Sequence, residues 1–180
     1  MVREVRGMTV PGFIRDRKSI RKYKDKQVSL KLLESLVASA ALAPSAGNRQ
    51  PWYFYVITNP AVKEELRGVV RTGAFLQEAP AAIVVCAVIG RVFERYGFRG
   101  AGLYFSQDTA AAIENMLLAA AANGLGTCWI GGFDEAGAAK LLGIDVGELW
   151  PVAIVTVGYP DEDPERRERL PLQEIMAVID

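Results

Sequence analysis

The sequence predicts an α+β domain in which helices cover both faces of a sheet. Apolar residues make up 51% of the 180 residues and charged residues 23%, which is typical of one globular domain with a sizeable core. Helical and strand patterns follow one another irregularly, unlike the regular order of repeated βαβ units. The segment 81–88 is almost wholly apolar and rich in valine, which indicates a strand buried on both faces.

Two helices in the first half of the chain have recognisable start signals. Ser29 can cap a helix whose apolar residues recur at intervals of three and four between positions 32 and 40. That helix has to end before Pro44, because the residue preceding a proline is pushed out of helical geometry. Asn59 and Pro60 then supply a cap and a first helical residue for the next helix.

Short apolar segments predict the strands. They occupy residues 52–58, 81–88, 127–130 and 152–158. Between Gly90 and Gly102, arginine, glycine and aromatic residues alternate without a period, and we expect a mobile excursion there.

The second half of the chain contains two further helix patterns. A long alanine-rich helix begins near Ser106 or Asp108 and stops at Gly124, which is well placed as the residue after the last turn. Its small side chains allow other helices or a second subunit to approach closely. Asp134 caps a shorter helix that ends at Gly143.

The charge and the residue types argue against several function classes. Lys and Arg total 21, as do Asp and Glu, so the basic excess of a nucleic-acid binder is missing. No apolar run approaches the roughly 20 residues that span a bilayer and no signal-peptide core is visible, so we expect a cytoplasmic protein that binds no membrane. We expect Cys86 and Cys128 to be buried free thiols.

The sequence contains no histidine. This removes the commonest general base and most zinc and iron sites. If the protein catalyses a reaction, we therefore expect a group other than its own side chains to carry the chemistry.

The basic segment 15–26 is the first candidate site. Arg17, Ser19 and Arg21 alternate with a period of two, so an extended chain would present all three on one side. Two guanidinium groups with a hydroxyl between them suit a phosphate monoester, whose oxygens arginine binds bidentately. A solvated charged face is the alternative interpretation.

A second basic cluster lies far away in the sequence, at Arg166, Arg167 and Arg169. If the tail folded back, Arg167 and Arg169 could complete one phosphate cradle with the first cluster. The alternative is an exposed tail that pairs with Glu165 and Glu168, each pair contributing roughly 0–1 kcal/mol. Sequence spacing does not decide between the two.

Two uncharged loops could bind a flat ligand. The segment ALAPSAGNRQPW carries Ser45, Asn48 and Gln50, and an amide presents a donor and an acceptor together to the edge of a heterocycle. The paired glycines of WIGGF allow positive φ and let a planar ligand lie close to the main chain. Both compositions are also those of ordinary turns, and that interpretation stays open.

Four segments, taken in order, resemble the FMN-dependent nitroreductase family. They are RKSIRKY near the start, APSAGNRQPW after the first long helix, AAAIENMLLAAAANGLGTCWIGGF later, and PVAIVTVGYP followed by RERLP near the end. The resemblance extends from Arg15 to Ile175, nearly the whole chain. Larger family members place additional helices in mid-chain that shape the substrate channel, and here only the segment 91–103 could do so.

The resemblance implies a fold, an assembly and a cofactor. The implied fold is an α/β/α sandwich with a mixed, largely antiparallel central sheet, in a homodimer with exchanged C-terminal arms and FMN at the interface. One domain spans residues 1–180, with an N-terminal segment 1–14 and a C-terminal arm 161–180. The alanine-rich helix and the apolar tail then become dimer interface.

The family motifs also imply which residues bind FMN. The phosphate and ribityl end is expected to contact Arg17, Lys18, Ser19, Arg21, Arg167 and Arg169. The isoalloxazine ring is expected to lie against Pro44, Ser45, Ala46 and Asn48 of the other subunit. Its opposite face is expected to lie along Ile130, Gly131 and Gly132, with the Gly131 N–H donating to flavin N5.

The implied activity is that of an FMN-dependent NAD(P)H oxidoreductase. NADH or NADPH passes a hydride to flavin N5, and a nitroaromatic or quinone acceptor is then reduced in the same pocket by ping-pong kinetics. No catalytic side chain is implied, since the flavin carries the chemistry. The alternatives are a non-catalytic FMN-binding or redox-sensing module, a flavin-cleaving or dehalogenating relative, and a domain with an anion site but no flavin.

Overall fold

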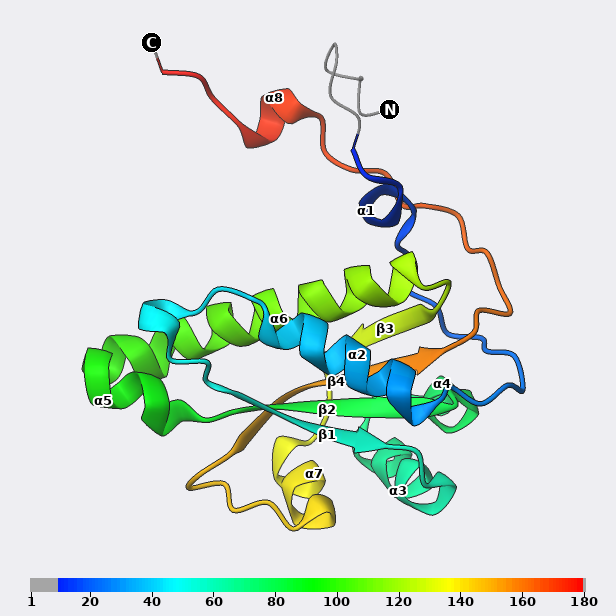
Figure 1. Ribbon diagram of the computed structural model, residues 1–180, viewed down its shortest axis with the longest axis horizontal. Coiled ribbons are helices and arrows are strands. Elements are labelled where there is room, and N and C mark those ends of the chain that lie inside the picture. The colour runs from blue at the N-terminus through cyan, green and yellow to red at the C-terminus, as the bar shows by residue number, and fades with distance from the viewer. Residues whose placement is uncertain (1–9, 180) are drawn as a thin grey trace.

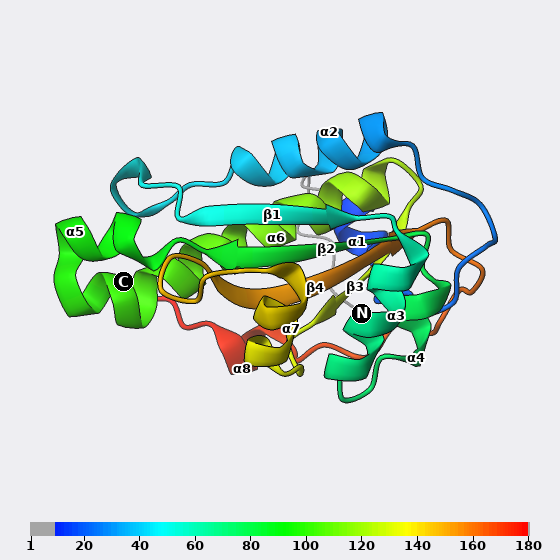
Figure 2. The ribbon, with the colours of Figure 1, turned by 90° about the horizontal axis from the view of Figure 1, so that it is seen from below.

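A four-stranded sheet forms the centre of the computed structural model, which describes residues 10–179. The strands are β1 (Trp52–Ile57), β2 (Ala81–Ala87), β3 (Gly126–Ile130) and β4 (Trp150–Gly158). Their order across the sheet is β1-β2-β4-β3, and each neighbouring pair is antiparallel. Helices lie on both faces of the sheet (Figures 1 and 2), so the predicted α+β sandwich is confirmed.

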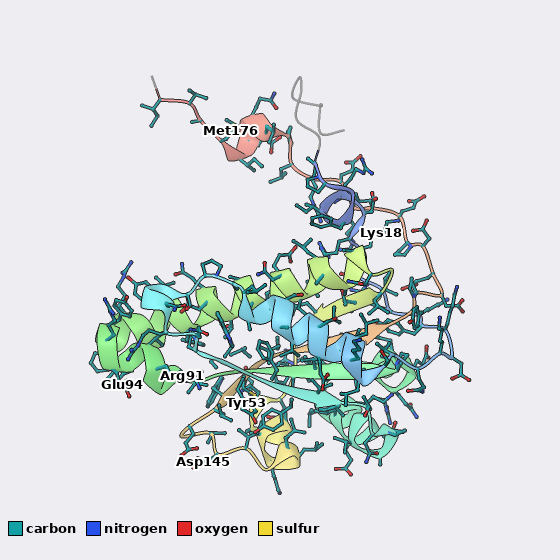
Figure 3. The ribbon with its side chains drawn as sticks, in the orientation of Figure 1. Lys18, Tyr53, Arg91, Glu94, Asp145 and Met176 are labelled. Carbon is teal, nitrogen blue, oxygen red and sulfur yellow. The ribbon has the colours of Figure 1, made fainter. Side chains whose placement is uncertain are left out.

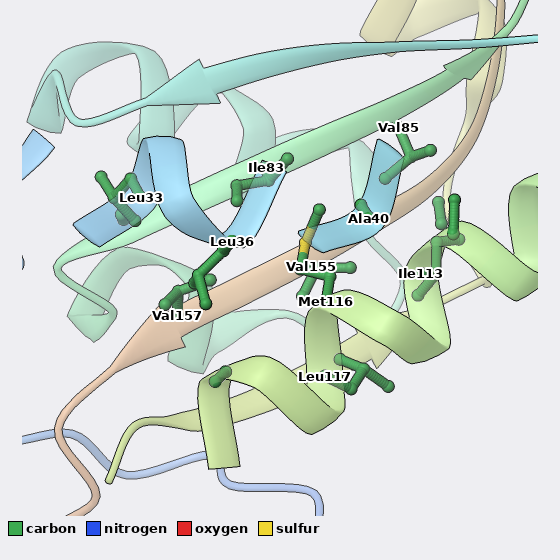
Figure 4. Packing of buried hydrophobic residues seen from close by; sticks show 14 of the residues in the cluster. Leu33, Leu36, Ala40, Ile83, Val85, Ile113, Met116, Leu117, Val155 and Val157 are labelled. Atoms are coloured by element: carbon green, nitrogen blue, oxygen red, sulfur yellow. The ribbon is translucent and has the colours of Figure 1, made fainter. Parts of the chain in front are cut away.

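Helices α2 (Leu30–Ala41) and α6 (Phe105–Ala122) cover one face of the sheet. Figure 4 shows Leu36 of α2 and Met116 of α6 packed against Val155 of β4. All three side chains are fully buried, and the removal of such apolar surface from water contributes about 25 cal/mol per Å².

The opposite face is covered by α3 (Pro60–Val69), α4 (Ala74–Glu78) and α7 (Glu135–Leu142). Successive residues of β2, such as Ile83 and Val84, therefore point to opposite faces of the sheet and pack against different helix layers. Every residue of β2 is buried, as its apolar sequence predicted.

The predicted helix signals are confirmed. The Ser29 side chain accepts a hydrogen bond from the Leu32 N–H at 3.3 Å, and Asn59 does the same for Ala61 at 2.9 Å. Asp134 caps α7, which ends at Gly143 in the left-handed conformation. These local contacts fix where the helices begin and end.

The segment 90–102 is helical, so the prediction of a mobile excursion was wrong. It forms α5 (Ile89–Arg99) and a π-helical turn, η2 (Gly100–Tyr104). Gly97 interrupts the helix with φ 53° and ψ −140°, which explains why no single period is visible in the sequence. A Cβ on Gly100 would lie 2.4 Å from the carbonyl oxygen of Val92, so the two turns pack closely.

The remaining helices are short. Helix α1 (Gly12–Asp16) was not expected, and neither was α4, because five residues are too few to show a period. Residues 1–9 of the expected N-terminal segment lie outside the described residues.

The C-terminal arm leaves the body of the protein after β4. It passes α1, contains α8 (Leu172–Ile175) and runs away from the sheet (Figure 1). Its apolar side chains are exposed, including Leu170 at 63%, Ile175 at 60% and Ile179 at 96%. Within residues 10–179, no helix has the length and apolar character needed to cross a membrane.

Candidate functional site

The basic segment 17–21 runs in an extended conformation beside the edge strand β3. Ser19 forms a parallel bridge with Thr127, and the Ile20 N–H donates to the Thr127 carbonyl at 2.9 Å. Ile20 is buried while Ser19 and Arg21 are exposed, which is the predicted alternation.

The C-terminal segment 164–169 folds back over this basic segment. Together they enclose a pocket of about 320 Å³, and its walls come from Arg17, Lys18, Ser19, Arg21, Pro164, Glu165, Arg166, Arg167 and Arg169. The two basic clusters therefore meet, as one of the two sequence interpretations proposed. In residues 10–179 the alternative pairing of the tail arginines with Glu165 or Glu168 does not occur within 4 Å. Six cationic side chains around one pocket suit a phosphate dianion.

Acidic side chains hold the walls of this pocket in place. Glu162 accepts hydrogen bonds from the backbone N–H groups of Arg21 and Lys22, at 2.5 and 3.1 Å. Lys18 pairs with Asp163 at 2.5 Å. The role of these carboxylates was not predicted, although the acidic run PDEDP could have suggested a partner for the basic segment.

Two further contacts tie the pocket to the helices. Arg17 lies 3.6 Å from a carboxylate oxygen of Glu114 on α6. Arg166 donates to the Arg15 carbonyl oxygen at the end of α1. The arm is thereby attached to the body of the protein where it crosses the pocket.

The glycine turn after β3 lies on the same edge of the sheet as the arginine pocket. Ile130 is three residues beyond Thr127, a distance of about 10 Å along a strand. A Cβ on either Gly131 or Gly132 would meet no atom within 4 Å, so the main chain there is open to a flat ligand. The sequence suggested that these glycines would adopt positive φ. Neither does, so the backbone conformation of the turn does not require glycine at either position.

Ile130 itself is buried in the core beneath α7, with 7% of its surface exposed. Its side chain therefore packs inward, and only its backbone can face a ligand at this edge.

The loop 44–50 is an ordered turn with an unusual backbone. It contains the short helix η1 (Ala46–Asn48), and Asn48 and Gln50 have φ values of 54° and 48°. Non-glycine residues adopt positive φ infrequently, so side-chain contacts must maintain this shape. The Ser45 hydroxyl provides one of them by accepting from the Gln50 N–H at 2.9 Å.

Asp108 provides the second contact, and sequence reasoning missed its role. Its carboxylate accepts the Ala46 N–H at 3.0 and 3.2 Å, and the residue is only 7% exposed. Burial raises the pKa of this carboxyl. The sequence suggested a helix start near Ser106 or Asp108. Helix α6 begins at Phe105, and the Asp108 side chain turns to the loop.

Helix α5 fixes the other side of the loop. Arg91 donates to the Gln50 carbonyl at 2.6 Å. Arg49 donates to the Arg91 carbonyl at 2.8 Å and pairs with Glu94 at 3.0 Å. Figure 3 shows Arg91 and Glu94 at this end of the molecule, and Lys18 at the other end.

Within one chain, no residue of the loop 44–50 lines the arginine pocket. Asp108 lies near the start of α6, next to the loop, whereas Ala122 at its end lines a cleft together with Arg17 and Lys18. The Arg17 side chain reaches Glu114, which lies six residues after Asp108, about 9 Å along the helix.

The thiols offer no competing chemistry. Cys86 and Cys128 are buried and free, as predicted. Burial raises the pKa of Cys86 to about 12 and also raises the pKa of Cys128, so both stay protonated near neutral pH. In residues 10–179 no group of three or more cysteine or acidic side chains is placed to hold a metal ion.

Comparison with known proteins agrees with this architecture. The model of the nitroreductase family matches residues 14–88 and 70–159. The chain belongs to the nitroreductase family. The chain is also 37% identical over 153 residues to a protein of Archaeoglobus fulgidus provisionally named NADH dehydrogenase/NAD(P)H nitroreductase, a match that covers 83% of this chain and 84% of that protein.

Solved structures of nitroreductases share the fold. A nitroreductase family protein from Streptococcus pneumoniae superposes with a TM-score of 0.84 at 26% identity, covering 93% of this chain and 98% of the other. A protein of Exiguobacterium sibiricum, provisionally named a nitroreductase and solved in complex with FMN, superposes with a TM-score of 0.81 at 21% identity over 93% and 95%. The family and the names of these relatives support an oxidoreductase.

Proposed function

We propose that this nitroreductase family member is an FMN-dependent NAD(P)H oxidoreductase that reduces electron-poor acceptors such as nitroaromatics and quinones. The observation that carries the proposal is the arginine pocket formed by residues 17–21 and 164–169. Ser19 of this pocket bridges Thr127, and an open glycine turn follows about 10 Å further along the same strand, so one elongated ligand with an anionic end and a flat end suits both. The FMN complex of the Exiguobacterium protein supports this choice of ligand.

The arginine pocket holds the phosphate end. Arg17, Lys18, Ser19 and Arg21 contact the phosphate and ribityl chain, together with Arg167 and Arg169 from the arm. Arginine suits this role because its planar fork binds two phosphate oxygens at once. Glu162 and Asp163 orient the basic segment without lying among the pocket-lining residues.

The glycine turn holds the flat end. The backbone of Ile130, Gly131 and Gly132 lies along one face of the isoalloxazine ring, and the Gly131 N–H donates toward N5. The absence of a Cβ leaves the space that the ring requires. When bound, FMN supplies hydride transfer between the nicotinamide donor and the acceptor, a chemistry that the side chains of this chain do not offer.

The active protein is a homodimer in which Pro44, Ser45, Ala46 and Asn48 of a second copy line the remaining face of the ring. No residue of this loop lines the arginine pocket of the same chain, which supports that assignment. The exposed apolar residues of the arm support a second copy as their partner.

The test compares FMN with riboflavin, which lacks the phosphate. We expect Arg21→Gln and Arg167→Gln each to weaken FMN binding at least about tenfold, because a hydrogen bond to a charged group contributes about 1.5–3 kcal/mol. Riboflavin binding should weaken much less in both variants, because riboflavin keeps the ribityl chain and lacks only the phosphate. Arg67→Gln, an exposed arginine on α3 that pairs with Glu64, is the matched control.

Fluorescence titration of the apoprotein measures both ligands. Equal losses for FMN and riboflavin would contradict a phosphate site at these arginines.

A further inference from the structure

A cluster of two tyrosines and two arginines from α5 and η2 stands against the loop 44–50. The Tyr96 and Tyr104 rings meet edge to face, with centroids 5.1 Å apart. Arg95 lies 5.6 Å from the centre of the Tyr96 ring, and Arg99 lies 5.4 Å from that of Tyr104. Cation–π attraction and the Arg99 hydrogen bond to the Tyr104 hydroxyl at 2.9 Å hold the four side chains together.

The cluster touches the loop at Gly47. A Cβ on Gly47 would lie 2.5 Å from the Tyr96 hydroxyl oxygen and 3.3 Å from Arg95 Nε. These two side chains therefore occupy the space beside the residue that separates Ala46 from Asn48. Both of those neighbours belong to the proposed wall of the flavin pocket, so the cluster borders the space where an acceptor would enter.

The arginines at this end of the molecule are not equivalent. Arg49 pairs with Glu94, Arg91 donates to a loop carbonyl, and Arg99 donates to a tyrosine. Arg95 is exposed, and within residues 10–179 no carboxylate lies within 4 Å of it and no protein acceptor takes its N–H groups.

The buried carboxylate of Asp108, behind the loop, accepts the Ala46 N–H and forms no ion pair with Arg95. Arg95 thus keeps its guanidinium available to a ligand.

We propose that Arg95 determines acceptor specificity and favours electron-poor aromatic acceptors that carry a carboxylate or another anionic group. A guanidinium binds such a group bidentately, and the adjacent tyrosine rings offer an aromatic surface to the rest of the acceptor. The inference rests on the proposed function, because the loop and its neighbours reach a flavin only in the dimer.

The test uses two nearly isosteric acceptors, 4-nitrobenzoate and 4-nitrobenzamide, with the FMN-loaded full chain. We expect a higher kcat/KM for the anion, and we expect Arg95→Gln to lower the anion-to-amide ratio of kcat/KM about tenfold, the factor that 1.4 kcal/mol represents. Arg95→Lys keeps the charge without the bidentate fork and should retain only part of the preference. Lys140→Gln removes a positive charge from α7 on the other side of the sheet and should leave the ratio unchanged.

Three outcomes overturn the inference, and they differ in what else they affect. An unchanged ratio in Arg95→Gln, with normal turnover of both acceptors, overturns the inference alone. An effect confined to anaerobic flavin reduction by NADPH assigns the charge to the nucleotide and also overturns it. Failure of the wild-type protein to turn over either acceptor would contradict the proposed function, and the inference with it.

Discussion

Asp108 illustrates how one buried side chain sets the shape of a proposed binding loop. Its carboxylate is the acceptor of the Ala46 N–H, in a loop whose neighbouring residues adopt positive φ. Burial disfavours the ionised form of this carboxyl group, which raises its pKa. The hydrogen bond to Ala46 offsets part of that cost, so loop shape and carboxylate are linked.

Replacing Asp108 separates the hydrogen bond from the charge. Asp108→Ala leaves the Ala46 N–H without an acceptor, and we expect the free energy of unfolding to fall by about 1–3 kcal/mol. Asp108→Asn keeps an oxygen acceptor and should retain most of that free energy. Urea unfolding measures both, and equal losses in the two variants would contradict the hydrogen-bonding role.

The raised pKa of Asp108 also predicts a pH dependence. Because the folded protein holds this proton more tightly than the unfolded chain, the stability contributed by the group is largest when the carboxyl is protonated. It decreases as the pH rises from the ordinary carboxyl range through the raised value. Urea unfolding across the acidic range should show this decrease in the wild type and not in Asp108→Asn.

At the level of elements, the edge strand β3 positions both halves of the proposed flavin site. The Thr127 carbonyl accepts a hydrogen bond from the Ile20 N–H of the basic segment, and the strand continues into the glycine turn after Ile130. Gly126 lies beneath Ile20, where a Cβ would come within 2.7 Å of the isoleucine side chain. Close contact at this glycine therefore holds the segment 17–21 against the sheet.

The two glycines of this strand and turn should respond differently to alanine. Gly126→Ala must displace Ile20, and we expect a loss of about 1–3 kcal/mol in unfolding free energy together with weaker FMN binding. Gly131→Ala meets no atom within 4 Å and should change the unfolding free energy by less than about 0.5 kcal/mol. Thermal unfolding and FMN titration compare them, and wild-type FMN affinity in Gly126→Ala would contradict this account.

For the whole molecule, the exposed arm and the divided site point to the same assembly. The arm carries a row of exposed apolar residues after Arg169, while the loop 44–50 contributes no residue to the arginine pocket of its own chain. A second copy of the chain would cover the apolar residues of the arm and supply the loop that the site lacks.

Truncation after Arg169 tests this assembly. We expect the full chain to sediment as a dimer. The truncated chain should dissociate into monomers at much higher protein concentrations, because truncation removes the exposed apolar side chains that would pack against the second copy. The truncated chain keeps both arm arginines of the pocket. A full chain that sediments as a monomer would contradict the proposed dimer.

Most of the fold could be predicted from local signals, whereas the site could be predicted only in pieces. Caps such as Ser29 and Asp134, and the apolar run of β2, act through neighbours in the sequence. The meeting of Arg21 with Arg167 depends on where the arm travels, and spacing carries no such information. Helix α5 was missed because Gly97 breaks its period.

The absorption spectrum of the purified protein, followed by anaerobic addition of NADPH or NADH, tests the central claim most directly. We predict a yellow protein that releases FMN on denaturation and whose visible absorption bleaches with at least one of the two nucleotides. A colourless protein that added FMN does not reconstitute would contradict the flavin site, and the arginine pocket would then require another ligand.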